Sequence, residues 1–532
     1  SAEDGYPRGI QLLGECYDRG YGVEPDIEKA VQLYQQASDK GNVPAMCSLG
    51  LCYELGRGVE EDKDKARELY LRAAERGYPR AQCNLGYFYY QGIGVEEDND
   101  EAVKWFTKAA EDGYPRAQQL LGECYENGYG VEKDEARAAQ LYAMAHRAGF
   151  VPATCALGLC YEYGDGVEKD MSKAIALYRQ AAEQGYPRAQ CNLGFCYYRG
   201  IGVEEDDNEA VKWFIQAAGQ DYPRAMSLLA ECYENGYGVE KDIHKAVEWY
   251  QKAAEMGYPP AQCSLGLCYE LGDGVEMDKA RAVELYHQAA RQGHARSQCN
   301  LGFCYYQGIG VEEDNDQAFQ WFEKSAAQGY PRAMQLLGEC YENGYGVQED
   351  IMKAVELYRQ AHEKGSAAAT CSLGLCYELG QGVEEDKAHA VELYRQAAER
   401  GLPRAQCNLG YCYYTGIGVA EDDLEAVKWF QKAAGRGQAR ALFLLGECYE
   451  EGHGVQVDME TAREYYQKAA DKGYQSAQDA LKRLNGEVVP TSAYSYVAPS
   501  PAAQPKPPAP APQPPKAKEK PKRGGLFGFF KK

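Results

Sequence analysis

The chain has 532 residues and a net charge of −23, from 57 basic and 80 acidic side chains. Such an acidic surface repels the phosphates of nucleic acids and of anionic lipids, so the body of the chain is expected to bind neither. No apolar run reaches the roughly 18 residues that a membrane-spanning helix needs. No signal peptide is visible. The chain begins in the middle of an internal repeat, so a longer precursor with more repeats or a signal upstream is an alternative.

A repeat of 36 residues runs from the start of the chain to about residue 485. It is anchored on a glycine, the repeat glycine, which opens the tetrapeptide Gly14-Glu15-Cys16-Tyr17 and returns at a constant step. The next three residues read Glu-Cys-Tyr, Leu-Cys-Tyr and Phe/Tyr-Cys-Tyr in turn, which defines the first, second and third repeats of a block of 108 residues. The sequence therefore predicts 13 repeats, arranged as four blocks and one further repeat.

Each repeat is predicted to begin with a helix, helix A. In the second repeat, Ala45, Leu49 and Tyr53 are four residues apart, which is typical of one face of a helix. Gly50 lies on that helix, where a hydrogen side chain lets a neighbouring helix approach closely. Gly56 is expected to end helix A in the left-handed conformation.

A second helix, helix B, is predicted to follow in each repeat. Asp62 is expected to cap its start, and Ala66, Tyr70 and Ala73 give it a buried stripe. Gly77 then ends helix B, before a Pro-Arg step opens the next helix A. One such helix pair cannot bury its own apolar face, whereas a stack of them can.

The motif Leu-Gly-x-x-Tyr-x-x-Gly-x-Gly-Val-x-x-Asp-x-x-x-Ala, which runs from Leu49 to Ala66, resembles the Sel1-like repeat family of tetratricopeptide-like repeats. The resemblance covers about residues 1–485. It implies an all-α solenoid, a right-handed superhelix of 13 helix-turn-helix repeats whose concave face is lined by A helices. It also implies an adaptor that holds partner proteins. Phe88, Asp221 and Ala230 depart from the pattern and predict slight local repacking.

Helix A has positions that its core residues do not use. Counted from the repeat glycine as zero, they are −6, −3, −2, +1, +4 and +5, and similarity to tetratricopeptide repeats places them in the concave groove. In third repeats these positions hold Arg, Asn and aromatic residues, which suit peptide backbones and interfaces. The predicted partner-binding residues are Arg80, Asn84, Tyr87, Tyr90, Arg188, Asn192, Phe195, Tyr198, Arg296, Asn300, Phe303, Tyr306, Arg404, Asn408, Tyr411 and Tyr414.

First repeats carry acidic residues at the same positions. These are Glu123, Glu126, Glu231, Glu234, Glu339 and Glu342. A groove that alternates aromatic-amide and acidic positions suits a protein or peptide partner with an extended backbone and spaced basic residues. The alternative is that these side chains only fill the surface of the superhelix. The chain is expected to act as a monomer.

The 20 cysteines occupy two columns of helix A, and helix B has none. Free thiols that serve as small apolar core residues are the leading interpretation. Disulfides between adjacent repeats, as between Cys52 and Cys83, are an alternative. No C-x-x-C spacing occurs and the seven histidines are scattered, so no metal site is predicted.

No catalytic or cofactor site is predicted either, because nearly every polar residue recurs from repeat to repeat and none forms a singular cluster. The histidines are interpreted as solvated surface residues. The sequence therefore predicts an interaction scaffold and not an enzyme.

Three regions are predicted. Residues 1–485 form the repeat array, closed by a capping helix from Gln475 to Asn485. Residues 486–523 form a disordered linker rich in Pro, Ala and Lys, and residues 524–532 form a basic, aromatic tip. The tip is interpreted as an unstructured tail, as a docking peptide or weak membrane-surface anchor, or as a segment that binds the acidic groove of its own chain. The membrane interpretation gives an alternative function, a membrane-surface or envelope-tethered accessory protein whose only membrane contact is this tip. The expected location is the cytoplasm, or outside it if a signal was removed.

Overall fold

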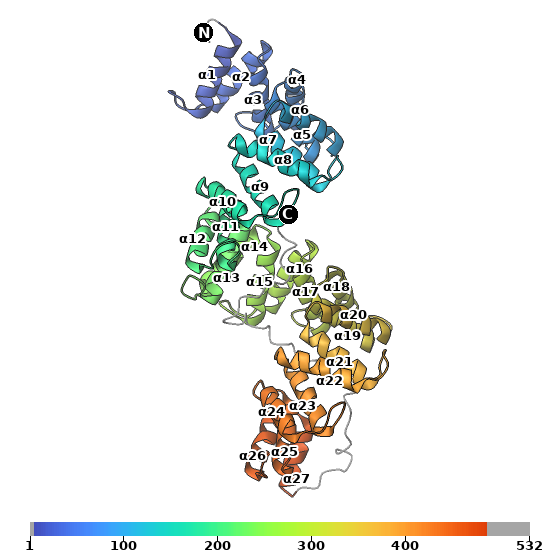
Figure 1. Ribbon diagram of the computed structural model, residues 1–532. Helices are drawn as coiled ribbons and strands as arrows, with labels where there is room; N and C mark the ends of the chain where they lie inside the picture. The colour runs from blue at the N-terminus through green and yellow to red at the C-terminus, as the bar shows by residue number, and fades with distance from the viewer. Residues whose placement is uncertain (1–4, 487–532) are drawn as a thin grey trace. The chain divides into compact units, whose positions relative to one another are not determined.

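The computed structural model describes residues 5–486, which form 27 α-helices and no strand (Figure 1). Apart from Gly486, the predicted linker and tip lie outside these residues. The chain divides into an N-terminal half, Ser1–Lys241, and a C-terminal half, Asp242–Lys532. Within each half, every helix packs against the helices before and after it in the chain. The predicted all-α solenoid of 13 helix pairs is therefore confirmed.

The A helices are α1 (Pro7–Arg19), α3 (Val43–Leu55), α5 (Pro79–Gln91), α7 (Pro115–Asn127), α9 (Val151–Tyr163), α11 (Pro187–Arg199), α13 (Pro223–Asn235), α15 (Pro259–Leu271), α17 (Ala295–Gln307), α19 (Pro331–Asn343), α21 (Ala367–Leu379), α23 (Pro403–Thr415) and α25 (Ala439–Glu451). The B helices are α2 (Ile27–Asp39), α4 (Lys63–Ala74), α6 (Asn99–Glu111), α8 (Glu135–Arg147), α10 (Met171–Glu183), α12 (Asp207–Ala218), α14 (Ile243–Glu255), α16 (Lys279–Arg291), α18 (Asn315–Ala327), α20 (Ile351–Glu363), α22 (Lys387–Glu399), α24 (Asp423–Ala434) and α26 (Met459–Ala470). A last helix, α27 (Gln475–Leu484), packs on α26.

Local sequence signals fix where the helices begin and end. Every B helix follows an Asp whose side chain accepts a hydrogen bond from a backbone N–H in the first turn, as Asp62 does from Lys65. Every A helix ends at a glycine in the left-handed conformation, as at Gly56 with φ of 64°. Asp221 replaces a glycine between repeats and keeps its positive φ, 57°.

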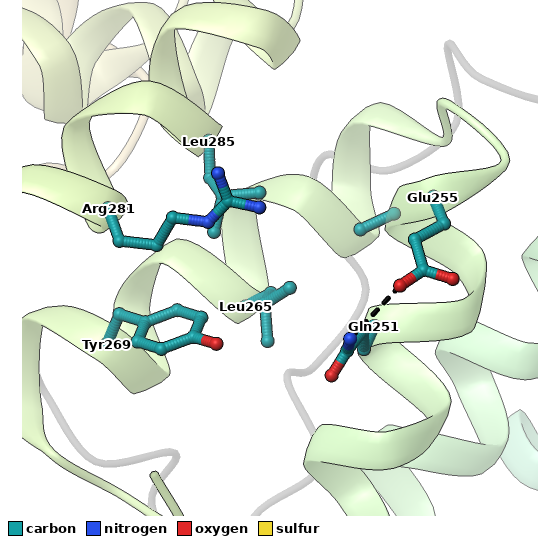
Figure 2. A pocket seen from close by; sticks show the side chains of 7 residues that line it. Gln251, Glu255, Leu265, Tyr269, Arg281 and Leu285 are labelled. Carbon is teal, nitrogen blue, oxygen red and sulfur yellow. Dashed lines mark hydrogen bonds between the residues drawn. The ribbon is translucent and has the colours of Figure 1, made fainter. Parts of the chain in front are cut away.

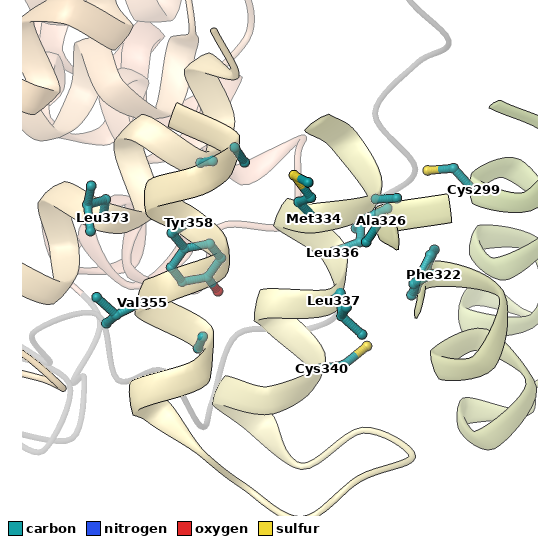
Figure 3. Close-up of a cluster of buried hydrophobic side chains, with 14 of the residues drawn as sticks. Cys299, Phe322, Ala326, Met334, Leu336, Leu337, Cys340, Val355, Tyr358 and Leu373 are labelled. Carbon is teal, nitrogen blue, oxygen red and sulfur yellow. The ribbon is translucent and has the colours of Figure 1, made fainter. Parts of the chain in front are cut away.

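The repeat glycine sets how closely the two helices of one repeat approach. A Cβ atom on Gly338 would lie 2.5 Å from the ring of Tyr358 on helix B, so only glycine fits without a shift. Around this contact, Phe322, Leu337 and Tyr358 are buried in one apolar cluster (Figure 3). One repeat has Ala230 at this position, and its side chain is fully buried.

The end of the array is closed as predicted by a short helix. In α27, Ala477 is buried, and Leu481 and Leu484 pack on the last repeat. Arg483 is also engaged, because its guanidinium pairs with Glu450 on α25 at 2.6 Å. Among the described helices, none is both long and apolar enough to cross a membrane.

Candidate functional site

The predicted partner-binding residues lie on the A helices of third repeats, α5, α11, α17 and α23. Their asparagines are less exposed than expected: Asn84, Asn192 and Asn408 are buried and Asn300 is partly exposed. Each asparagine Nδ2 lies 3.7–3.9 Å from a cysteine Sγ on the A helix before it. The asparagines thus tie adjacent A helices together. Arg80, Arg188 and Arg404 are partly exposed and Arg296 is exposed.

An arginine from the following repeat completes each of these sites, and the sequence reasoning missed it. The guanidinium of Arg116 stands over the ring of Tyr87, 5.4 Å from its centre, and donates to Asn84 Oδ1 at 3.5 Å. We call this group of Asn, ring and Arg a station. The other three are Asn192, Phe195 and Arg224; Asn300, Phe303 and Arg332; and Asn408, Tyr411 and Arg440, with ring distances of 5.4, 5.2 and 4.8 Å.

The missed arginines had a sequence signal. Position −6 holds Arg in first repeats as well as in third repeats, as at Arg116 and Arg332. A station joins the third repeat of one block to the first repeat of the next, so the pattern within a single repeat does not reveal it.

The tyrosines at +4 of third repeats face the interior of the repeat. The rings of Tyr90, Tyr306 and Tyr414 each meet a helix-B phenylalanine edge-on, at 6.2–6.4 Å between centres. Tyr198 does the same at 6.3 Å, and its hydroxyl donates to Glu231 on the next A helix at 3.0 Å. Tyr198 and Tyr306 are buried. These tyrosines therefore have structural contacts whether or not a partner is bound.

The glutamates at +4 of first and second repeats also have partners inside the chain. Glu126 accepts a hydrogen bond from Tyr142 at 2.7 Å, and Glu342 accepts one from Tyr358 at 2.6 Å. Both tyrosines are buried on helix B. Two of the predicted acidic positions are thus occupied by bonds that hold each helix pair together.

The glutamates at +1 of first repeats lie close to arginines from two repeats later. Burial raises the pKa of Glu123 to about 7, and Arg188 opposes that shift. Burial likewise raises the pKa of Glu339 to about 7, against the effect of Arg404. Each arginine is thus near enough to affect the pKa of a glutamate two repeats earlier, so both side chains lie on the surface that successive A helices form. We call this surface the helix-A face.

No group of three His, Cys, Asp or Glu side chains could hold a metal ion within residues 5–486. A pocket of about 60 Å³ between α14, α15 and α16 is far smaller than the roughly 300–1,000 Å³ of most ligand sites. Figure 2 shows its labelled side chains, Gln251, Glu255, Leu265, Tyr269, Arg281 and Leu285.

All 20 cysteines are free thiols, and all but Cys16 are buried. Cys52 and Cys83 form no disulfide, which agrees with the core interpretation. The reading of all the histidines as solvated is wrong for His294. Its Nδ1 lies 2.8 Å from Ser297 Oγ, and burial lowers its pKa to about 4.

Comparison with known proteins now decides the family. The Sel1 repeat model matches 13 consecutive segments of 36 residues, from residue 7 to residue 474. The chain belongs to the Sel1 repeat family. A search of curated proteins found no match.

Two solved structures of Sel1 repeat proteins are similar to this chain. One is a protective antigen present in uropathogenic Escherichia coli strains, with an SLR fold. It is 34% identical with a TM-score of 0.57, over 80% of this chain and 91% of that one. The other is a Sel1 repeat protein from Oxalobacter formigenes, 33% identical with a TM-score of 0.41, over 60% of this chain and 94% of that one. Sel1 and related repeat proteins generally mediate protein–protein interactions, and the family is one of non-catalytic scaffolds.

Proposed function

We propose that this Sel1 repeat protein is an interaction scaffold that holds an extended segment of a partner protein on its helix-A face. The observation that carries the proposal is the recurrence of the station, twice in each half of the chain. Tyrosine and arginine in desolvated pockets carry much of the binding energy of protein interfaces, and phenylalanine is enriched in the cores of these interfaces.

Folding alone does not account for the stations. Second repeats carry leucine at +1, as at Leu159 and Leu375, and form the same helix pairs. Position −2, where the stations bury an asparagine, holds alanine or serine in second repeats, as at Ala156 and Ser372. Burying an amide and stacking a cation are thus features that the repeat can do without. Their retention in every third repeat supports a role in binding.

The test uses the full chain as bait in a lysate of the cells that produce it. One variant carries Tyr87→Ala, Phe303→Ala and Tyr411→Ala. The control carries Trp249→Ala on helix B, where Lys252 stands over the ring at 4.3 Å. We expect a stoichiometric protein that wild type and control retain and the triple variant loses. Equal capture by all three chains would place binding elsewhere.

A further inference from the structure

The charged side chains of the helix-A face differ in what already contacts them. Glu126 and Glu342 accept hydrogen bonds from buried tyrosines, and Glu339 accepts one from Gln335 at 2.5 Å. By contrast, the arginines of three stations, Arg116, Arg332 and Arg440, have no carboxylate within salt-bridge distance among residues 5–486. Some arginines of helix B do have such a partner, as Arg359 has Glu356 at 3.0 Å and Arg395 has Glu392 at 3.0 Å. The side chains left available for a partner are therefore the cationic ones.

We propose that the station arginines Arg116, Arg332 and Arg440 bind side-chain carboxylates of an acidic segment in the partner protein. The inference rests on the proposed function and names the chemistry that the helix-A face recognises. It replaces the expectation of a basic partner. That expectation came from acidic residues such as Glu126 and Glu342, which already accept hydrogen bonds from tyrosines of the same chain.

The station geometry suits a carboxylate. The ring beneath each guanidinium has its centre 4.8–5.4 Å from the guanidinium carbon, and the asparagine Oδ1 accepts from one N–H in two of the three stations, at 3.5 Å for Arg116 and 3.4 Å for Arg440. A guanidinium has five N–H donors in one plane, so an edge remains for two parallel bonds to a carboxylate. All three arginines are partly exposed and can be reached from solvent.

Side-chain carboxylates fit better than a C-terminal carboxylate because the station recurs. A partner chain has one C-terminus but can carry several acidic side chains. In the C-terminal half, the stations of Arg332 and Arg440 are 108 residues, or three repeats, apart. A segment lying along the helix-A face could place successive carboxylates on them.

The net charge of −23 does not prevent this contact. Charges farther apart than about 8 Å are largely screened at physiological salt. Many acidic side chains lie in the loops before helix B, as at Glu96 and Glu97, and are exposed. Glu447 lies near the station of Arg440, and burial, followed by Glu451 and Glu450, raises the pKa of Glu447 to about 7.

The experiment selects peptides on the full chain from a random library of about 12 residues, fused at their C-termini to a phage coat protein so that no free carboxyl end exists. The expected binders are rich in Asp and Glu. Their affinity should fall about tenfold for the variant R116Q, R332Q and R440Q. It should stay within about twofold for R359Q and R395Q, which remove helix-B arginines.

Selection of basic or purely apolar peptides, or of no peptide, would overturn the proposal. Acidic peptides that bind the triple variant R116Q, R332Q and R440Q as well as wild type would also overturn it. A matching variant with lysines at the three positions should also bind weakly, since lysine cannot form the stacked, two-bond contact. If that variant binds like wild type, the stacked geometry is not what recognises the peptide. The two proposals can fail separately. If the lysate experiment captures a protein that depends on the station rings, but the peptide library yields no acidic binders, the scaffold function stands and only the carboxylate assignment is wrong.

Discussion

First and third repeats join helix A to helix B in different ways. In the first repeat of the fourth block, Glu342 on α19 accepts a hydrogen bond from Tyr358 on α20 at 2.6 Å. In the third repeat just before it, Tyr306 on α17 meets Phe322 on α18 edge-on at 6.4 Å. The residue at +4 of helix A and the buried aromatic residue of helix B change together. A glutamate is paired with a tyrosine through a hydrogen bond, and a tyrosine is paired with a phenylalanine through a ring contact.

This difference separates structural residues from candidate binding residues. A glutamate that a buried tyrosine holds is part of the fold, although in the sequence it resembles a charged binding position. The stations, in contrast, join neighbouring repeats through groups that second repeats lack. The following predictions test this separation, from the largest expected effect to the smallest.

Removing the hydroxyl of Tyr358 should break its hydrogen bond to Glu342. Tyr358→Phe leaves the Glu342 carboxylate without its donor and should cost about 1–3 kcal/mol of local stability. Because stability in repeat arrays is local, hydrogen exchange of α19 and α20 is the measurement.

Adding Glu342→Tyr to Tyr358→Phe would install the third-repeat pair in a first repeat. The double variant should recover much of the loss, whereas an additive loss would mean that the two positions are independent.

The glutamate at +1 should make stability depend on pH. Burial raises the pKa of Glu339 from 4.5 to about 7, so the folded chain holds a proton that the unfolded chain releases. Stability should therefore be highest below about pH 4.5 for this group and fall as pH rises to about 7. Glu339→Gln should flatten that fall by about 1–3 kcal/mol, since each unit of pKa difference corresponds to about 1.4 kcal/mol.

Urea-unfolding midpoints across this pH range measure the effect, with exposed Glu356→Gln on α20 as the control. Identical pH profiles for wild type and Glu339→Gln would contradict the raised pKa.

Thiol reactivity should show the smallest effect. Cys16 on α1 is partly exposed, whereas its equivalent Cys124 on α7 is buried. Burial also raises the pKa of Cys124 to about 12, which disfavours the reactive thiolate. A thiol reagent should label Cys16 first in the native chain and all 20 cysteines after unfolding. Fewer than 20 labelled thiols in denaturant would indicate disulfides.

The fold could be predicted from sequence because its signals are local and repeat 13 times. Asp62 as a cap, Gly56 as a helix end and Gly50 as a close contact each depend on one repeat, and the structure confirms each of them. The candidate site depends on contacts between repeats. Arg116 reaches Tyr87 across 29 residues, and Glu126 is engaged by Tyr142 from another helix. The recurrence of one residue type at a given repeat position does not show which side chain of another helix or repeat it contacts.

Hydrogen exchange of the full chain, alone and with its captured partner, tests the central claim most directly. If the helix-A face holds the partner, protection should increase in α5, α7, α17, α19, α23 and α25, the helices that carry the stations of Arg116, Arg332 and Arg440. The B helices should stay unchanged. Protection confined to the B helices would contradict the account and place binding on the opposite side of the repeats.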